Sequence, residues 1–408
     1  MDRVLYIIAA GERDERLSPL TEYRPKAMLR FGSGGTLMDF SLYNALTSDT
    51  GDAVVLTDYL SDMVDGYLRR LWKPAFDAHS KKLLPLHCKR LKKERFEGDG
   101  DAVYHALKML SSFNGGVPET VAVLPPDHIY KMDFRHLIKF HHSHGAAITL
   151  AATIKGHFEE HGADILSVRN DCRITEFHHS PQNLDTTVPS VRNPLAAMGV
   201  YVFQRDTLLK YLERNQAENS HDLSRDILPM MIASEEARAF IFAKKDGKNE
   251  YWRDIRDIHS YWRTHMDILN GQFKELLLSP IPGLYQTPFS ANNLVRRAEI
   301  GRRRIFNCIV SETARIGNAD IEEAIIGPDV LIEDGASIRR SVILDGAVIR
   351  KWSTLDGAVV EPLAEVHYGC VPIKKVEAPE TQPVPVMEGS IEQYLAKPVL
   401  QVAGHVCG

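Results

Sequence analysis

A six-residue periodicity in the last third of the chain restricts the fold more than any other feature. Aliphatic residues recur there at steps of about six, and the step continues after a one-residue slip. They are Ile326, Leu331 or Ile332, Ile338, Leu344, Ile349 and Leu355, and the glycines among them are Gly317, Gly327, Gly335, Gly346 and Gly357. Such a step is typical of a parallel β-helix, in which each coil buries its apolar row only against its neighbours. The alternative is a few ordinary strands joined by glycine turns.

The first 250 residues follow another pattern, in which short apolar runs alternate with longer amphipathic segments. Six runs have the length and flanks of buried strands: Val4–Ala10, Ala53–Thr57, Thr120–Leu124, Ala146–Ile154, Leu195–Phe203 and Ala237–Ala243. Helical spacing is found in Phe134–His144 and Arg205–Arg214. The alternation predicts an α/β domain with a largely parallel sheet, which binds ligands at the carboxyl ends of its strands. We therefore expect functional residues after Ala10, Leu124 and Phe203.

The chain is predicted to divide near residue 279. A last helix is expected over about Asp257–Leu278, and the segment Ser279–Gly283, which contains two prolines, ends it. These signals predict an α/β domain at residues 1–278, a linker at 279–297, a β-helix domain at 298–370 and an irregular, Pro-rich C-terminal extension at 371–408.

Composition excludes several classes of protein. With 49 Lys and Arg against 54 Asp and Glu, the chain has a net charge of −5. It therefore lacks the overall positive charge that attracts a nucleic acid. The 5 cysteines are scattered without a CxxC pair, which indicates neither a disulfide framework nor a zinc site. Val4–Ala10 is far shorter than the roughly 20 residues that span a bilayer. A reduced, cytoplasmic location is the default expectation.

The loop after the first strand is the first candidate for chemistry. Gly11–Thr21 follows that strand directly, and Arg24–Lys26 comes shortly afterwards, at the place where α/β folds bind phosphate. By itself such a segment also suits a solvated loop. Four histidines, His136, His141, His142 and His144, suggest a metal cluster, but we predict that they lie on the exposed face of an amphipathic helix.

Eight segments, in this order, resemble the motifs of the glucose-1-phosphate adenylyltransferase family, also called ADP-glucose pyrophosphorylase. They are Gly11–Thr21, Arg24–Lys26, Asp39–Asn44, Gly98–Tyr104, Asp127–Asp133, Met198–Phe203, His221–Asp222 and Tyr251–Asp254. The resemblance covers nearly the whole chain. It implies a nucleotidyltransferase domain with a Rossmann-like, mostly parallel sheet, followed by a left-handed parallel β-helix of the hexapeptide type.

The resemblance also implies an activity. Members of the family make ADP-glucose and pyrophosphate from ATP and glucose 1-phosphate, for glycogen or α-glucan biosynthesis, and require Mg2+. The sugar phosphate attacks the α-phosphorus of ATP in line, so the protein contributes alignment and charge neutralisation. Homotetramers or mixed tetramers with a catalytic paralogue, and control by metabolites, are implied as well.

Site residues follow from the same resemblance, position by position. It makes Arg16 and Lys26 catalytic cations, and Asp127 and Asp254 metal ligands. The implied nucleotide contacts are Gly11, Gly98, Asp101 and Ala102. The implied sugar-phosphate contacts are Phe96, Gly162, His179, Ser180, Ala197, Tyr201, Asp222 and Trp252. An aspartate after a strand also suits a helix N-cap, which is the alternative for Asp127 and Asp254.

The sequence departs from the family pattern in five places. In the loop that reads Gly-Gly-x-Gly-Thr-Arg-Leu in the family, the residues Glu12, Asp14 and Glu15 replace two glycines and the threonine. Ser180 stands where the family has a lysine that grips the sugar phosphate, and His179 where it has a glutamate. The remaining changes are Pro125 and Pro126 for Ser-Gly, Ala197 for a serine, and Asp58 for a glutamine. These departures leave open a weakly active or inactive regulatory subunit, a ligand sensor, and a pyrophosphorylase that uses another nucleoside triphosphate.

Overall fold

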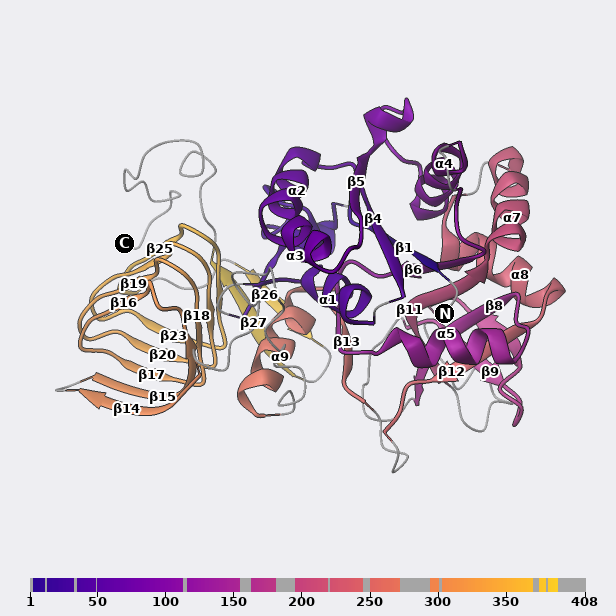
Figure 1. Ribbon diagram of the computed structural model, residues 1–408. Helices are drawn as coiled ribbons and strands as arrows, with labels where there is room; N and C mark the ends of the chain where they lie inside the picture. The colour runs from indigo at the N-terminus through magenta and orange to yellow at the C-terminus, as the bar shows by residue number, and fades with distance from the viewer. Residues whose placement is uncertain are drawn as a thin grey trace. The chain divides into compact units, whose positions relative to one another are not determined.

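The structure is a computed structural model that describes residues 3–11, 13–32, 35–48, 50–112, 116–154, 163–180, 195–218, 221–244, 250–271, 294–300, 303–369, 374–378 and 381–387. The chain forms two compact units. One comprises Met1–Glu12 and Phe40–Trp252, and the other comprises Arg13–Asp39 and Arg253–Gly408. Figure 1 labels the elements of both units.

A nine-stranded sheet forms the centre of the first unit, with the order β10-β9-β11-β6-β1-β4-β5 and with β8 joining β11 to β12. Its strands are β1 (Val4–Ala9), β4 (Gly51–Thr57), β5 (Leu83–His87), β6 (Thr120–Leu124), β8 (Ile148–Ile154), β9 (Ile165–Val168), β10 (Ile174–His178), β11 (Leu195–Gln204) and β12 (Ala237–Ile241). The pairings make all of them run in one direction except β10 and β11. The mostly parallel sheet is therefore confirmed.

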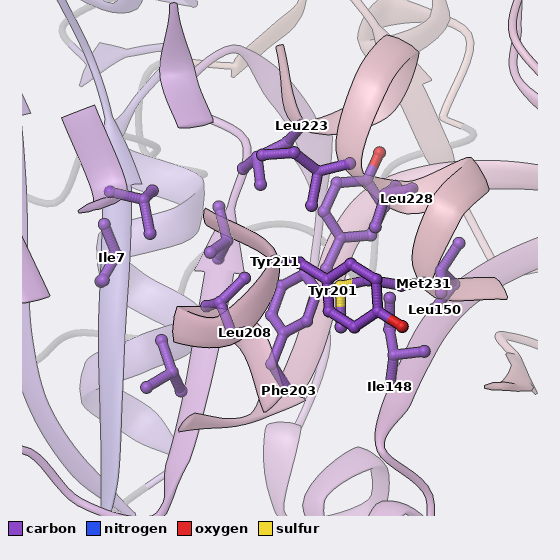
Figure 2. Close-up of a cluster of buried hydrophobic side chains, with 14 of the residues drawn as sticks. Ile7, Ile148, Leu150, Tyr201, Phe203, Leu208, Tyr211, Leu223, Leu228 and Met231 are labelled. Atoms are coloured by element: carbon purple, nitrogen blue, oxygen red, sulfur yellow. The ribbon is translucent and has the colours of Figure 1, made fainter. Parts of the chain in front are cut away.

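Helices cover this sheet and bury its apolar strands. They are α1 (Asp39–Thr47), α2 (Ser61–Tyr67), α3 (Lys73–Ala78), α4 (Asp99–Ser111), α5 (Phe134–Ser143), α7 (Arg205–Glu218) and α8 (Leu228–Ser234). Helix α4 packs against α7, and α5 packs on β8 and β12. Figure 2 shows part of the resulting core, in which Ile7 of β1 and Phe203 of β11 lie with Leu208 of α7. Such burial of strands on both faces explains why their sequences are almost continuously apolar.

The direction of β11 corrects one expectation about the site. Strand β11 runs antiparallel to β6, with Gln204 opposite Thr120 at the beginning of β6. The end of β11 after Phe203 therefore lies at the opposite edge of the sheet from the carboxyl ends of β1 and β6. Since the apolar run is the same for either direction, its sequence did not indicate this reversal. The beginning of β11, not its end, reaches the edge where ligands are expected.

Helix α5 corrects the prediction for the four histidines. His136, His142 and His144 are exposed, but His141 is only 2% exposed, and its Nδ1 lies 2.8 Å from Oγ1 of Thr149 on β8. His141 follows Leu137 and Ile138 at helical spacing, so it shares their buried face. Burial is the main cause that lowers the pKa of His141 to about 4, so the ring is neutral at physiological pH.

The second unit begins with the segment that carries Arg16 and Lys26. This segment contains two short helical turns, Glu15–Leu17 and Lys26–Met28, and the strand pair β2 (Arg30–Phe31) and β3 (Gly35–Thr36). Helix α9 (Ile258–Leu269) belongs to the same unit and starts at an N-cap, Asp257, whose side chain accepts a hydrogen bond from the backbone of Ser260. The helix ends before the predicted Leu278. Residues 272–293, which include most of the predicted linker at 279–297, lie outside the described residues, and residues 294–297 belong to a strand.

A parallel β-helix follows in the same unit. Its strands are β15 (Arg303–Val310), β16 (Arg315–Ile316), β17 (Asp320–Glu322), β18 (Ile325–Ile326), β19 (Leu331–Ile332), β20 (Ser337–Arg339), β21 (Val342–Ile343), β22 (Val348–Ile349), β23 (Thr354–Asp356), β24 (Val359–Val360) and β25 (Glu365–Val366). Partners in successive coils lie 16 residues apart at the first coil and 17 apart at the next ones, fewer than three steps of six would give, which explains the slip in the periodicity. The predicted aliphatic row, including Ile326, Ile332 and Ile338, is buried.

Three further strands flank the coils. Strand β14 (Leu294–Ile300) pairs antiparallel with β15, and β26 (Lys374–Ala378) pairs antiparallel with β27 (Thr381–Met387), which adjoins β24. The extension after residue 370, expected to be irregular, therefore contains two strands. Among the helices of the described residues, none has the length and apolarity needed to cross a lipid bilayer.

Candidate active site

Three predicted or suspected site residues follow neighbouring parallel strands in the first unit. Gly11 follows β1, Asp58 follows β4 and Asp127 follows β6. A side chain at Gly11 would place its Cβ 2.4 Å from the backbone nitrogen of Asp58, so the two loops approach too closely for any residue but glycine. Asp58 accepts a hydrogen bond from the backbone of Phe96 at 3.0 Å. Gly11, expected at the nucleotide, and Asp127, the first expected metal ligand, therefore lie at the same edge of the sheet.

The expected nucleotide segment packs directly on the chain around His221. A Cβ at Gly98 would lie 2.3 Å from the carbonyl oxygen of His221, and the backbone of Gly100 donates a hydrogen bond to that oxygen at 2.9 Å. Two residues after His221, Leu223 donates its backbone N–H to the side chain of Asp99 at 2.8 Å. The glycine is therefore required by this close approach, which also brings Asp222 next to the beginning of α4.

Asp101 lies within an internal ionic network. Its side chain is fully buried, and both oxygens lie 2.6 Å from Nζ of Lys93. The backbone of Glu97 and the amide of Gln216 also donate hydrogen bonds to it. Burial alone would raise the pKa of Asp101, but these partners outweigh it and lower the pKa. Ala102, beside it on α4, is buried in the core.

Asp164 connects four of the expected sugar-phosphate residues. Its Oδ1 lies 2.9 Å from Nδ1 of His179 and accepts a hydrogen bond from the backbone of Ser180 at 3.0 Å. Its carbonyl accepts from the backbone of Ala197 at 2.9 Å. Ser224 lies 3.4 Å from His179 and donates to Asp222 at 3.2 Å. The structure therefore brings His179, Ser180, Ala197 and Asp222 together in the first unit.

Two other residues expected at the sugar phosphate, Tyr201 and Phe96, lie in or pack against the hydrophobic core, and Gly162 lies outside the description. Tyr201 is 7% exposed and lies among the core side chains between Leu150 and Phe203. Phe96 is partly buried and packs against the same core. Gly162, like Glu12 of the loop, lies outside the described residues.

Trp252 is buried and contacts His128, the residue after Asp127. The indole Nε1 lies 3.2 Å from Nδ1 of His128, and the two rings meet edge to face with centroids 5.5 Å apart. The same Nδ1 lies 2.8 Å from the carbonyl oxygen of Met198. These two hydrogen bonds require opposite protonation of Nδ1, so the ring makes one of them at a time. Nε2 of His128 lies 3.7 Å from the carboxylate of Asp127.

In the second unit, Asp14 binds both cations expected at the phosphates. Its carboxylate accepts hydrogen bonds from Nε and Nη2 of Arg16 at 2.9 and 2.7 Å, and lies 3.0 Å from Nζ of Lys26. Burial alone would raise the pKa of Asp14, but these two cations outweigh it and lower the pKa to about 2. Arg16 is exposed, whereas the side chain of Lys26 is only 7% exposed.

The second expected metal ligand also has a cationic partner. Asp254, at the end of β13 (Trp252–Asp254), is 8% exposed and accepts a hydrogen bond from Nε of Arg256. The helix-capping alternative is wrong for both expected metal ligands, because α5 is capped by Asp133 and α9 by Asp257.

Sequence reasoning missed Asp164, Arg256 and Lys93. A signal existed for Asp164. Strands β9 and β10 pair as an antiparallel hairpin with Ile165 opposite His178, so Asp164, before Ile165, lies opposite His179, after His178. Arg256 stands two residues from Asp254, a spacing that is also common without an ion pair. Lys93 lies in a loop, where the sequence does not indicate which carboxylate it meets.

Comparisons with known proteins agree with this architecture. The nucleotidyl transferase family model matches residues 5–271, and the GlmU-like C-terminal hexapeptide model matches residues 290–372, consistent with a left-handed β-helix. A glucose-1-phosphate adenylyltransferase of Aliivibrio fischeri is 30% identical over 358 residues, covering 84% of this chain and 86% of that protein. One from Leifsonia xyli is 29% identical over 360 residues, covering 84% of each.

A third relative matches a shorter part. The glucose-1-phosphate adenylyltransferase of Thiobacillus denitrificans is 32% identical over 270 residues, which are 65% of this chain and 61% of that protein. The chain therefore belongs to the glucose-1-phosphate adenylyltransferase family of nucleotidyltransferases.

Proposed function

We propose that this chain transfers the adenylyl group of ATP to glucose 1-phosphate, forming ADP-glucose and pyrophosphate for glycogen or α-glucan synthesis. A phosphate oxygen of the sugar phosphate forms a bond to the α-phosphorus, and the bond from that phosphorus to the bridging oxygen of pyrophosphate breaks. The observation that carries the proposal is the set of aspartate and cationic side chains retained where the family has its metal and phosphate contacts.

Nucleotidyltransferases of this family generally use a divalent metal ion, and we propose Mg2+ held by Asp127 and Asp254. The donor set fits, because Mg2+ prefers carboxylate oxygens, and both carboxylates are largely buried. Trp252, two residues before Asp254, contacts His128, the residue after Asp127, within the first unit. When bound, such an ion neutralises charge on the phosphate oxygens.

The protein's own cations complete the proposed site. Arg16 and Lys26 would contact the triphosphate, and the loop at Gly11 and the segment of Gly98, Asp101 and Ala102 would border the nucleotide. The group around Asp164 supports a sugar-phosphate subsite in which His179 and Ser180 take the places of the family's charged side chains. A protonated His179 would supply positive charge there, which Ser180 cannot.

Assembly and location complete the proposal. We expect a homotetramer, or a mixed tetramer with a catalytic paralogue, because stacked coils of a β-helix need their ends covered. We also expect a cytoplasmic protein, since both proposed substrates are cytoplasmic metabolites. Allosteric control by metabolites is expected from the family, and no residue is assigned to it.

The variant Asp127→Asn tests the proposed chemistry. Without the carboxylate, Mg2+-dependent release of pyrophosphate from ATP and glucose 1-phosphate should fall at least a hundredfold, because an amide neutralises less of the metal's charge. Asp62→Asn, which removes an equal charge from the exposed surface of α2, should keep full activity. Unchanged turnover and unchanged Mg2+ dependence in Asp127→Asn would refute the metal assignment.

A further inference from the structure

The carboxylate of Asp14 is bound to the two cations that the proposed function assigns to the triphosphate. Arg16 contacts it through Nε and Nη2 at 2.9 and 2.7 Å, and Nζ of Lys26 lies 3.0 Å from it. The side chains of Asp14 and Lys26 are only 4% and 7% exposed, so water screens the contact between them little. A phosphate oxygen would bind the same guanidinium and ammonium groups with the same geometry.

We infer that Asp14 acts as an internal competitor of the nucleotide's phosphates for Arg16 and Lys26, and thereby determines the affinity of the chain for its nucleoside triphosphate. The inference rests on the proposed function, because it takes those two cations as the phosphate ligands. It goes further by naming a residue that determines the affinity for phosphate and by stating the direction of its effect on that affinity. Asp14 lowers the affinity, whereas a residue that merely positioned the cations would raise it.

The competition is expected from the charges and burial of the group. A phosphate oxygen that reaches Lys26 comes within a few ångströms of the Asp14 carboxylate, and like charges at that distance repel strongly where water is excluded. Binding therefore requires Asp14 to move away or to share its cations, and either change costs free energy. The low pKa of Asp14 keeps the carboxylate ionised at physiological pH, so the competition is not relieved by protonation.

Other contacts hold the shape of the loop without this charge. Oδ1 of Asp14 accepts a hydrogen bond from the backbone of Arg16 at 3.0 Å, and the carbonyl of Asp14 accepts one from the hydroxyl of Thr21 at 2.6 Å. An asparagine at this position retains an acceptor for the first bond and leaves the second unchanged. The variant Asp14→Asn therefore removes the competing charge and keeps the cap.

Glu15 provides a matched control. It is the next residue of the same turn, it carries the same charge, and its side chain is exposed. If the negative charge of the loop acted only through its general field, Glu15→Gln and Asp14→Asn would have similar effects. If Asp14 acts through its contacts with Arg16 and Lys26, the effect is confined to Asp14→Asn.

The test is an equilibrium titration of the full-length chain with Mg2+ and ATP, and separately with tripolyphosphate. We expect Asp14→Asn to lower the Kd about tenfold for both ligands, and Glu15→Gln to change it less than twofold. A gain with tripolyphosphate places the effect at the phosphates instead of the base. Asp14→Ser, which keeps a hydroxyl acceptor for the cap, should shift the Kd in the same direction, and thermal unfolding verifies that each variant is folded.

Several results would overturn the inference. They are an unchanged or higher Kd in both Asp14 variants, an equal gain in Glu15→Gln, and the absence of measurable binding in every protein at millimolar ligand. Pyrophosphate release in the same preparations reports on the proposed function separately. Tighter binding in Asp14→Asn without turnover in any protein would uphold the inference and refute the proposed activity.

Discussion

Arg256 donates a hydrogen bond from its Nε to the carboxylate of Asp254, the second proposed metal ligand. The guanidinium is partly buried, with 23% of its side chain exposed, and Asp254 is more deeply buried. A cation that approaches Asp254 must therefore compete with a cation that the chain already supplies. Lys26, a proposed phosphate ligand, is likewise paired with Asp14. Two groups of the proposed site therefore already have a partner of opposite charge within the second unit.

Removal of the guanidinium should strengthen metal binding. In Arg256→Gln, we expect Mn2+, used as a paramagnetic probe, to bind about fivefold more tightly, which corresponds to about 1 kcal/mol. Free Mn2+ measured by electron paramagnetic resonance gives the Kd without any need for turnover. Arg263→Gln removes the same charge from an exposed position of α9 and should leave the Kd unchanged. Weaker binding in Arg256→Gln would show that Arg256 orients Asp254 instead of competing with the metal.

His265 should make the stability of the second unit depend on pH. Its ring is buried, Nδ1 donates to the carbonyl of Tyr261 at 2.8 Å, and Nε2 accepts from the backbone of Gly32 at 3.2 Å, so the neutral ring suits both contacts. Burial is the main cause that lowers its pKa to about 4. Because the unfolded chain takes up the proton near pH 6.5, stability is present above that pH and is lost as pH falls toward 4.

Urea unfolding measures this dependence. Between pH 7.5 and pH 5, His265 should account for a loss of about 2 kcal/mol in the free energy of unfolding. In His265→Gln, the loss over the same range should be smaller by that amount, while the contribution of His141 stays the same in both proteins. Equal pH dependence in the two proteins would mean that His265 titrates normally in the folded chain.

Asp101 is predicted to stabilise the fold. Asp101→Asn leaves Lys93 without its buried partner, and we expect a loss of about 3 kcal/mol in the free energy of unfolding. The control is Glu213→Gln, which breaks an exposed ion pair between Glu213 of α7 and Lys108 of α4, the helix that also carries Asp101. This substitution should change stability little. Unchanged stability of Asp101→Asn would contradict this structural role.

Much of the fold could be predicted from the sequence, because apolar runs and the six-residue step report directly on burial. Partners that depend on chain direction or on loop geometry could not. The apolar pattern of β11 is the same in a parallel and an antiparallel strand, so its reversal became visible only in its pairing with β6. His141 shows the opposite case: the prediction of an exposed ring is wrong, although its helical spacing from the apolar Leu137 and Ile138 could have indicated the buried face.

The candidate site, too, was predictable only in part. The resemblance indicated the positions of the site residues, and the sequence showed the acidic loop, but it did not show the partner of each charged side chain. That Asp14 meets both Arg16 and Lys26 depends on the path of the loop between them, which local residue preferences do not determine. The pair of Asp164 and His179 depends likewise on the register of a hairpin.

Trp262 ties helix α9 to the β-helix. Its indole N–H donates to the carbonyl oxygen of Arg340 at 2.6 Å. Trp262→Phe keeps the ring but loses the donor, so we expect a loss of about 1 kcal/mol in the free energy of unfolding, followed by circular dichroism in urea. Trp352→Phe, at a position that is 65% exposed, should change stability by much less. Similar effects of the two substitutions would argue against a specific role for this hydrogen bond.

The most direct test of the account is the release of pyrophosphate by the purified chain with Mg2+, glucose 1-phosphate and, in turn, ATP, UTP, dTTP and GTP. The proposed function predicts sustained turnover with ATP, formation of ADP-glucose in equal amount, and much slower reaction with the other three nucleotides. Faster turnover with another nucleotide would contradict the proposed substrate. The absence of turnover with all four, in a chain that is folded, would contradict the proposed activity itself.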